Sequence, residues 1–150
     1  MKVVVQRVKY AKCHIDGAVY SQIGRGMVVL VGIGLDESDE DIEWLVKKLP
    51  RMRIFDDEAG VMNLSLEDVA GEMMVVSQFT LHASTKKGNR PSWFRAAPEP
   101  VSRPIYDRFV ERMTRTLGRE VATGSFGADM QIELQNDGPV TIIIDTHDLS

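Results

Sequence analysis

The sequence predicts an α+β fold: a single domain over residues 1–150, with a mainly antiparallel, barrel-like β-sheet and two main helices. Three observations favour this class. About seven segments have the residue pattern of strands, two have helical periodicity, and the two kinds do not alternate regularly. The chain also has the length of one ordinary domain, and neither a linker nor an internal repeat divides it.

The first predicted elements are strands. Residues 3–8 are mostly valine and indicate a strand buried on much of both faces, while Asp16-Gly17 between β-prone residues is a strong hairpin signal. Residues 27–33 are apolar throughout, which predicts a central strand. Four glycines bracket this strand as turns or as places where another backbone comes close: Gly24, Gly26, Gly32 and Gly34.

Two helices follow from capping signals and periodicity. Ser38 is a candidate N-cap, Asp41 stands three residues later as in a capping box, and Pro50 marks the stop. The second helix is expected from Pro104 to Leu117, with Ser102 as its cap and Gly118 just past its end. An arginine stripe recurs on this helix away from its apolar face: Arg108, Arg112, Arg115 and Arg119.

The remaining segments are predicted to be strands and turns. Residues 52–55 indicate a short strand, followed by a turn over 56–60. Apolar and polar residues alternate over 130–135, then Asn136-Asp137-Gly138-Pro139 breaks the pattern before strand residues resume at 140–144. We therefore expect two strands joined, or brought near each other, by an NDGP turn.

Composition excludes several classes of protein. Apolar residues make up 43% and charged residues 27%, as in ordinary globular domains. Cys13 is the only cysteine, so an intrachain disulfide and a Cys-based zinc site are excluded, and a reducing, cytoplasmic location is expected. The N-terminus lacks the apolar core of a signal peptide, and the longest apolar run is too short to cross a membrane.

Charge is distributed unevenly along the chain. The net charge is −4, yet the segment from Ser84 to Arg119 has nine basic and three acidic residues and carries +6. The rest of the chain therefore carries −10. Such asymmetry is typical of a surface that binds a polyanion, although a solvated helix face balanced by acidic loops would give the same count.

Known catalytic and metal-binding motifs are missing from the sequence. His14, His82 and His147 lie far apart and none has HxxxH or HExxH spacing, so we predict no metal site. There is no G-x-S-x-G elbow and no phosphate-binding loop. A Ser-His-Asp triad assembles from distant residues and is not excluded, but nothing in the sequence favours one.

The most unusual polar stretch is Ser77-Gln78-Phe79-Thr80-Leu81-His82-Ala83, written SQFTLHA, after the apolar run 73–76. If the strand continues, Gln78 and Thr80 face one side and line a polar pocket, whereas Ser77 and Phe79 face the other. The residues alone leave two interpretations open: one wall of a site, or the polar end of a strand.

SQFTLHA, followed by KGNRPS over 87–92 and NDGPVT over 136–141, closely resembles the D-aminoacyl-tRNA deacylase family. The N-terminal MKVVVQRV and the strand MVVLVGIG are also similar, so the resemblance spans essentially the whole chain. His82 and Trp93 stand where Tyr and Phe are more usual in the family, and both exchanges keep a ring.

The resemblance implies a function. Members hydrolyse the ester between a D-amino acid and the terminal adenosine of tRNA, act also on mischarged glycine, need no cofactor, and are homodimers with active sites at the subunit interface. It also implies that residues 77–81 line the pocket, and that Gly138-Pro139, with a cis peptide bond, enters the partner's pocket and blocks an L side chain.

The resemblance further implies roles for single residues. Catalytic candidates are Ser77, Gln78, Phe79 and Thr80, with backbone N–H groups of Phe79 and Thr80 stabilising the oxyanion while the tRNA 2′-OH assists a water molecule. Thr80 as nucleophile is the alternative. Candidates for binding the substrate and rejecting the L-enantiomer are Gly138, Pro139, Phe79, which could stack on the terminal adenine, and Arg7, which would brace the Gly-Pro segment.

The basic segment from Lys86 to Arg119 is the expected contact for the tRNA acceptor stem. Two other classes of function stay open: a non-catalytic RNA-binding module that keeps the pocket shape, and a hydrolase that acts on another small ester or amide. The presence of both SQFTL and GPVT favours the enzyme, because a binding module needs only one half of a chiral pocket.

Overall fold

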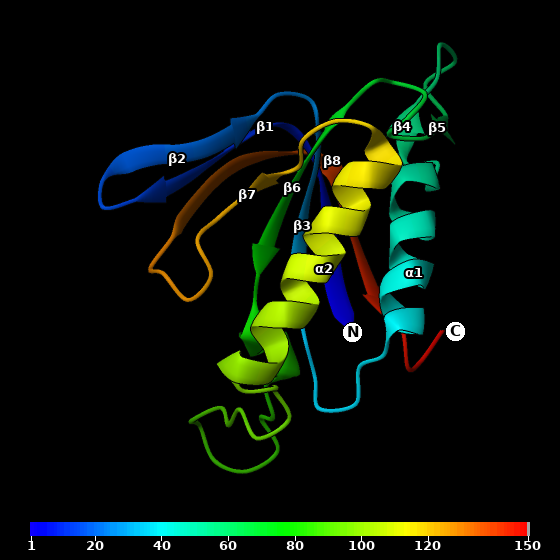
Figure 1. The fold of residues 1–150 in the computed structure, drawn as a ribbon. Coiled ribbons are helices and arrows are strands. Elements are labelled where there is room, and N and C mark those ends of the chain that lie inside the picture. The colour runs from blue at the N-terminus through cyan, green and yellow to red at the C-terminus, as the bar shows by residue number, and fades with distance from the viewer. Residues whose placement is uncertain (150) are drawn as a thin grey trace.

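The computed structural model describes residues 1–149. Its strands are β1 (Lys2–Ile15), β2 (Ala18–Ile23), β3 (Gly26–Gly32), β4 (Phe55–Asp56), β5 (Met62–Leu64), β6 (Glu72–Ser77), β7 (Ala122–Thr123) and β8 (Gln131–Asp145). Its helices are α1 (Asp39–Lys48) and α2 (Glu99–Leu117), with 3₁₀ turns η1 (Leu49–Arg51) and η2 (Phe79–His82). The two α-helices lie side by side on one face of a strongly curved sheet (Figure 1).

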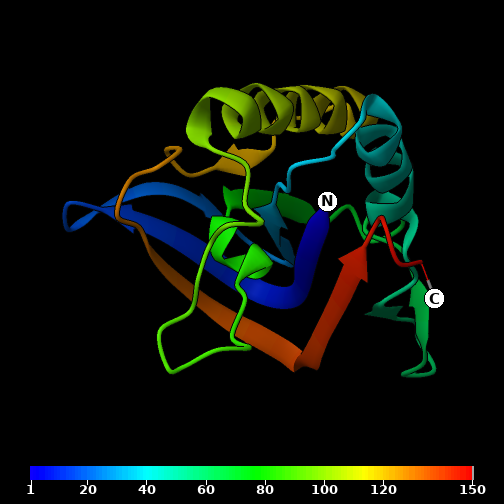
Figure 2. The same ribbon diagram turned by 90° about the horizontal axis from the view of Figure 1, so that it is seen from below.

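The main sheet has six strands in the order β2-β1-β3-β6-β7, with β8 paired to β1. β1 is antiparallel to β2, β3 and β8, whereas the β3–β6 and β6–β7 pairs are parallel. β8 follows β1 along most of its length, while β1 exchanges β3 for β2 beyond residue 8. The sheet is therefore barrel-like and mixed, and the predicted α+β class is confirmed (Figure 2).

The core lies between this sheet and the two α-helices. Leu45 of α1, Phe109 of α2 and Val29 of β3 have no exposed surface. Truncating a buried side chain of this size typically costs about 2–5 kcal/mol of stability. The α1 N-terminus is formed as predicted, because Ser38 and Asp41 make both hydrogen bonds of a capping box.

The second helix begins earlier than predicted, at Glu99 rather than near Pro104. Pro100 lies in the first turn, where a missing backbone N–H costs no hydrogen bond, and Pro104 lies inside the helix. Ser102 is consequently not the cap: its side chain is buried and its hydroxyl donates to the Pro98 carbonyl oxygen over 3.2 Å. Gly118, with φ +71°, ends the helix as expected.

Two strand predictions were wrong. Residues 52–55 contribute only Phe55 to β4, which pairs with the unpredicted β5. The two strands expected on either side of NDGP are one strand, β8, which changes direction sharply in Figure 2. Opposite Gln6 and Val8 of β1 stand Thr141 and Asn136, so four residues of β8 bulge out across from Arg7 alone.

No helix in the described part of the chain is long and apolar enough to span a membrane.

Candidate functional site

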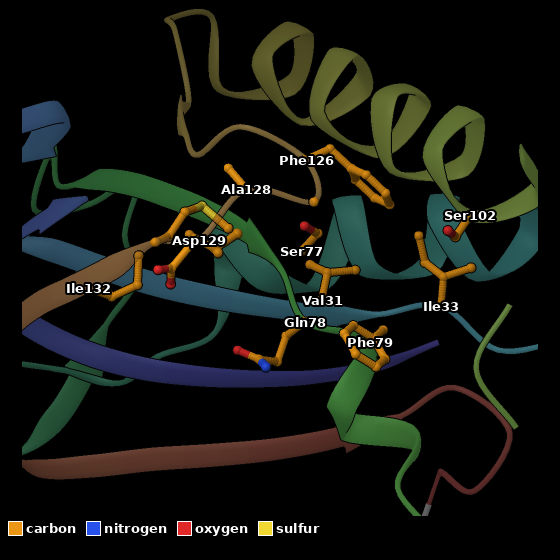
Figure 3. Close-up of a pocket in the computed structure, with 13 residues that line it drawn as sticks. Val31, Ile33, Ser77, Gln78, Phe79, Ser102, Phe126, Ala128, Asp129 and Ile132 are labelled. Carbon is orange, nitrogen blue, oxygen red and sulfur yellow. The ribbon is translucent and has the colours of Figure 1, made fainter. Parts of the chain in front are cut away.

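A cavity of about 310 Å³ opens beside the end of β6. Its walls come from the ends of β3 and β6, from the N-terminal part of α2 and from the segment between β7 and β8 (Figure 3). The lining residues are Val31, Ile33, Val76, Ser77, Gln78, Phe79, Ser102, Phe126, Gly127, Ala128, Asp129, Met130 and Ile132. Three of the four predicted catalytic candidates, Ser77, Gln78 and Phe79, thus line one space.

The SQFTLHA stretch is not a continued strand. Ser77 ends β6, the Gln78 N–H donates to the Val31 carbonyl over 2.7 Å, and the chain then turns into η2. The predicted alternation of faces is therefore wrong beyond Ser77, because β3 ends at Gly32 and offers no further pairing. Gln78 and Thr80 still lie together, since the Gln78 side-chain amide donates to the Thr80 hydroxyl.

The turn into η2 leaves backbone donors available. In a 3₁₀ turn each N–H bonds the carbonyl three residues back, so Leu81 donates to Gln78 over 3.2 Å. The N–H groups of Phe79 and Thr80 come first in the turn, and within residues 1–149 neither donates to a backbone carbonyl. Two adjacent free donors of this kind are suited to binding an oxyanion.

Close approach at two glycines fixes the position of η2. A Cβ atom on Gly32 would lie 2.8 Å from the Leu81 Cβ and 3.0 Å from the Gln78 carbonyl oxygen. A Cβ on Gly34 would lie 2.9 Å from the His82 ring, which is itself buried. The four bracketing glycines were predicted to be turns or places of close approach. At Gly32 and Gly34 the approaching segment is η2, whereas at Gly26 it is the backbone of Glu72 in β6.

Phe79 is not a core residue. Its side chain is 55% exposed and meets the Trp93 ring edge-on, with centroids 5.3 Å apart.

Across the cavity, Phe126 packs against Tyr106, whose hydroxyl donates to the Val75 carbonyl oxygen over 2.9 Å. Burial raises the pKa of Tyr106, so this hydroxyl stays a donor that ties α2 to β6.

Sequence reasoning missed the wall opposite Phe79. Ser102 was assigned to a helix cap, and the segment from Phe126 to Met130 was given no role, yet both line the cavity. Their sequence carries no motif, so only the tertiary fold brings them to the site.

Gly138 and Pro139 lie elsewhere. Neither residue is among those lining the cavity, and both are exposed on β8, joined by a cis peptide bond. Asn136 closes the bulge around them, because its side-chain oxygen accepts the Val140 N–H over 2.7 Å. Gly138 has φ +133°, a conformation that L side chains rarely adopt.

Arg7 supports this bulge from inside the protein. Its side chain is buried, and its Nε donates to the Asp137 carbonyl oxygen over 2.9 Å. One terminal nitrogen donates to the Ile54 carbonyl over 2.6 Å, and the other lies 3.0 Å from the position of a Cβ on Gly138. The guanidinium therefore holds the backbone beside Gly138-Pro139 in place.

The predicted basic segment divides into two parts. On α2, Arg112 pairs with Glu43 at 2.8 Å and with Asp39 at 3.3 Å, and Arg108 lies 3.6 Å from Asp39. Acidic residues of α1 thus offset much of the arginine stripe. Four basic side chains before α2 are exposed and make no ion pair within residues 1–149: Lys86, Lys87, Arg90 and Arg95.

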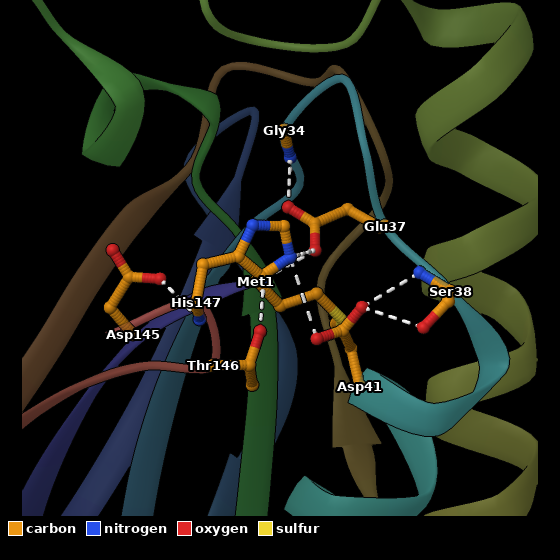
Figure 4. Close-up of polar contacts among 8 residues, drawn as sticks. All are labelled: Met1, Gly34, Glu37, Ser38, Asp41, Asp145, Thr146 and His147. Atoms are coloured by element: carbon orange, nitrogen blue, oxygen red, sulfur yellow. Dashed lines mark hydrogen bonds and ion pairs between the residues drawn. The ribbon is translucent and has the colours of Figure 1, made fainter. Parts of the chain in front are cut away.

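One cluster has the ligand types of a metal site, although none was predicted. Glu37, Asp41 and His147 bring ligand atoms within 4.8 Å of one another (Figure 4). The Met1 ammonium already forms an ion pair with Glu37. Burial alone would raise the pKa of Asp41, but hydrogen bonds from Thr146 and Ser38 outweigh it and lower this pKa to about 2.

Comparison with known proteins shows the family. A family model described as D-Tyr-tRNA(Tyr) deacylase matches residues 4–145. The chain belongs to this family. A D-aminoacyl-tRNA deacylase of Bacteroides thetaiotaomicron is 58% identical over 146 residues, which are 97% of each chain. Another, from Chromobacterium violaceum, is 56% identical over 97% of each chain. The family is one of hydrolases, which agrees with the predicted enzyme.

Two solved structures are similar to this deacylase-family chain. One, described as c-Myc DNA Unwinding Element Binding Protein, superposes with a TM-score of 0.92 at 40% identity, covering 97% of this chain and 99% of that one. The other, a probable eukaryotic D-amino acid tRNA deacylase, has a TM-score of 0.84 at 20% identity, covering 95% and 97%. The second similarity establishes the fold alone.

Proposed function

We propose that the protein hydrolyses the ester bond of D-aminoacyl-tRNA and releases the free D-amino acid and tRNA. The observation that carries the proposal is the pair of free backbone N–H groups at Phe79 and Thr80, beside a cavity, in a chain of this family. The tRNA 3′ end is the partner, and the reaction needs no cofactor. A cytoplasmic location, where charged tRNA is found, belongs to the same proposal.

In this mechanism a water molecule attacks the ester carbonyl and the two N–H groups bind the developing oxyanion. One such donor is typically worth about 10²–10³ in rate. The tRNA 2′-OH assists the water, so no side chain acts as nucleophile. This assignment is supported at Thr80, whose hydroxyl accepts a hydrogen bond from the Gln78 amide, a group that cannot act as a base.

Thr80 as nucleophile is the alternative mechanism. A threonine hydroxyl needs a general base within hydrogen-bond reach to become reactive. Within residues 1–149 the partner of the Thr80 hydroxyl is Gln78, so the surroundings favour a positioning role for Thr80.

Stereoselectivity is proposed to come from Gly138-Pro139 of a second subunit in a homodimer. Both residues are exposed, stand outside the cavity of their own chain and are held from behind by Arg7. A rigid Gly-Pro backbone placed over the partner's cavity would bind the α-amino group and exclude an L side chain. Glycine has no Cβ and would not be excluded, so the proposed activity extends to mischarged glycyl-tRNA.

A nucleic-acid-binding module is the second candidate. It is favoured by the high similarity to the solved structure described as c-Myc DNA Unwinding Element Binding Protein. Such a module would bind nucleic acid without cleaving the ester.

The experiment that separates these functions compares one tRNA charged with D-Tyr or L-Tyr. The protein is incubated with each, and loss of the ester is followed over time. We expect rapid loss of D-Tyr and little loss of L-Tyr. Equal rates for both substrates, or no hydrolysis of either, would overturn the proposed function.

A further inference from the structure

The loop between η2 and α2 is built to present cations to solvent. Ser84 and Ser92 exchange two backbone hydrogen bonds of 2.9 Å, which close the loop at its base. Gly88, with φ +67°, allows the turn at its tip. Residues 84–97 contain four basic and no acidic side chains, so the loop carries +4.

Aromatic rings stand beside these cations. Trp93 is 41% exposed and Phe94 is 65% exposed, and the Arg95 guanidinium lies 5.4 Å from the centre of the Phe94 ring. Trp93 also contacts Phe79, which lines the cavity. The Phe79–Trp93 contact therefore joins the cavity to the loop, and Phe94 presents a second exposed ring next to Trp93 in the sequence.

We propose that this surface, the loop 84–95, binds the unpaired nucleotides that precede the terminal adenosine at the 3′ end of tRNA. The inference rests on the proposed function, because it concerns the part of the tRNA substrate that lies outside the cavity. Rings of Trp93 and Phe94 stack on bases, while Lys86, Lys87 and Arg90 contact phosphates. Exposed rings within a cationic surface are the usual means of binding single-stranded nucleic acid.

Two other partners fit the loop less well. Duplex RNA keeps its bases stacked on each other, so it would leave Trp93 and Phe94 without a base to bind. A symmetric contact between two copies of this loop would bring two surfaces of charge +4 together. An unpaired RNA tail provides both phosphates for the basic side chains and unstacked bases for the aromatic rings.

The test uses three substrates that carry D-Tyr: adenosine, a tetranucleotide with the tRNA 3′ sequence, and full-length tRNA. The quantity measured is the tail gain, the ratio of kcat/KM for the tetranucleotide to kcat/KM for the adenosine. In the wild-type protein we expect a tail gain of at least about tenfold, the order expected from stacking one base.

Two variants remove the proposed contacts. Phe94→Ala should lower the tail gain about tenfold, and the double variant Lys86→Ala/Lys87→Ala should weaken the salt dependence of KM by about 0.7 per cation in the log–log slope. The matched control is Lys47→Ala, which removes an exposed cation on α1 that, like Lys86 and Lys87, makes no ion pair within residues 1–149. Its tail gain should equal that of the wild-type protein.

Several results would overturn the inference. If Phe94→Ala loses activity equally on the adenosine and the tetranucleotide, its tail gain equals that of the wild-type protein. The ring of Phe94 then does not bind the tail. A wild-type gain seen only with full-length tRNA would assign the loop to the duplex instead. Failure of the wild-type protein to hydrolyse any of the three substrates would refute the proposed function itself, which separates the two failures.

Discussion

The two segments proposed to form the active site are held by different physical means. Residues 77–80 are positioned by close approach at two glycines, because η2 leaves no room for a Cβ atom on Gly32 or Gly34. Residues 137–140 bulge away from β1 and are held mainly by the side chain of Arg7. The first segment faces a cavity, and the second faces solvent.

This difference has a consequence for assembly. The residues that line the cavity include an aromatic wall but not Gly138 or Pro139, whereas the Gly-Pro unit is exposed and is held from behind by Arg7. Each of the two segments therefore provides a part of the proposed site that the other does not. A second copy that brings Gly138-Pro139 to the cavity would complete two equivalent sites at once, as expected for a symmetric dimer.

The largest effect is expected from Gly32→Ala. Its Cβ would stand 2.8 Å from the Leu81 Cβ and 3.0 Å from the Gln78 carbonyl, so η2 must move and carry the two N–H donors with it. Since a shift of about 1 Å can cost about 10²-fold in rate, kcat for D-Tyr-tRNA should fall by about that factor while the KM changes little.

Gly24→Ala is the matched control for this prediction. Its Cβ would meet only the end of the Glu72 side chain, at 3.3 Å, which can move aside. Activity of this variant should equal that of the wild-type protein. Wild-type kcat in Gly32→Ala would contradict the role of η2, provided that circular dichroism shows both variants folded.

The second effect concerns the other segment. Arg7→Ala would leave the carbonyls of Asp137 and Ile54 without a donor, at a cost of about 1–3 kcal/mol of stability for each. A looser Gly-Pro unit should lower D-Tyr-tRNA hydrolysis and reduce the ratio of D to L rates about tenfold, a loss of about 1.4 kcal/mol of discrimination.

Arg7→Lys keeps the charge but cannot make both hydrogen bonds, so it should resemble the alanine variant in its D to L ratio. The ratio is measured with the same tRNA charged with each enantiomer. If Arg7→Ala or Arg7→Lys is folded and keeps the wild-type ratio of D to L rates, Arg7 does not position the Gly-Pro unit.

A smaller effect is expected at Thr80. If its hydroxyl only accepts the Gln78 hydrogen bond, Thr80→Ala should reduce kcat by no more than about tenfold, which corresponds to about 1.4 kcal/mol of lost positioning. Thr80→Ser should restore the rate. Complete loss of deacylation in a folded Thr80→Ala variant that still binds tRNA would instead support the nucleophile mechanism.

The smallest effect on catalysis is expected outside both segments, at Asp41. Its pKa is about 2 in the folded protein against 3.8 otherwise, so its stabilising contribution is present above about pH 4 and is lost as the pH falls towards 2. Asp41→Asn should lower the free energy of unfolding at neutral pH by about 1 kcal/mol.

The same substitution should remove part of the acid sensitivity of stability, as measured by urea unfolding at several pH values. The ratio of D to L rates should stay at the wild-type value. A changed ratio would mean that stereoselectivity follows general stability rather than the Gly-Pro segment.

The elements that local chemistry determines were predictable from the sequence. The Asp16-Gly17 hairpin, the Ser38 capping box and the Gly118 end of α2 each depend on a few neighbouring residues, and all three are present. The start of α2 was predicted too late because Ser102 was taken as the cap, whereas the helix already begins at Glu99 with Pro100 in its first turn.

The site was predictable only where a motif marks it. Ser77, Gln78 and Phe79 belong to the motif and line the cavity, but Ser102 and Phe126 reach it through the packing of α2 and the segment before β8. The single strand β8 was read as two because NDGP has the composition of a turn. Only the pairing with β1, which leaves Arg7 opposite four residues, shows it to be a bulge.

The claim that two subunits share each site is tested most directly by complementation. Gly32→Ala disables the cavity segment, and Gly138→Ala, whose Cβ would lie 2.8 Å from the Val140 side chain at φ +133°, disables the Gly-Pro segment. Each variant alone should be slow on D-Tyr-tRNA. Mixing them with subunit exchange should restore about a quarter of the wild-type rate, because half of the dimers are mixed and each of those has one intact site. A mixture no faster than the mean of its two components would contradict the shared site.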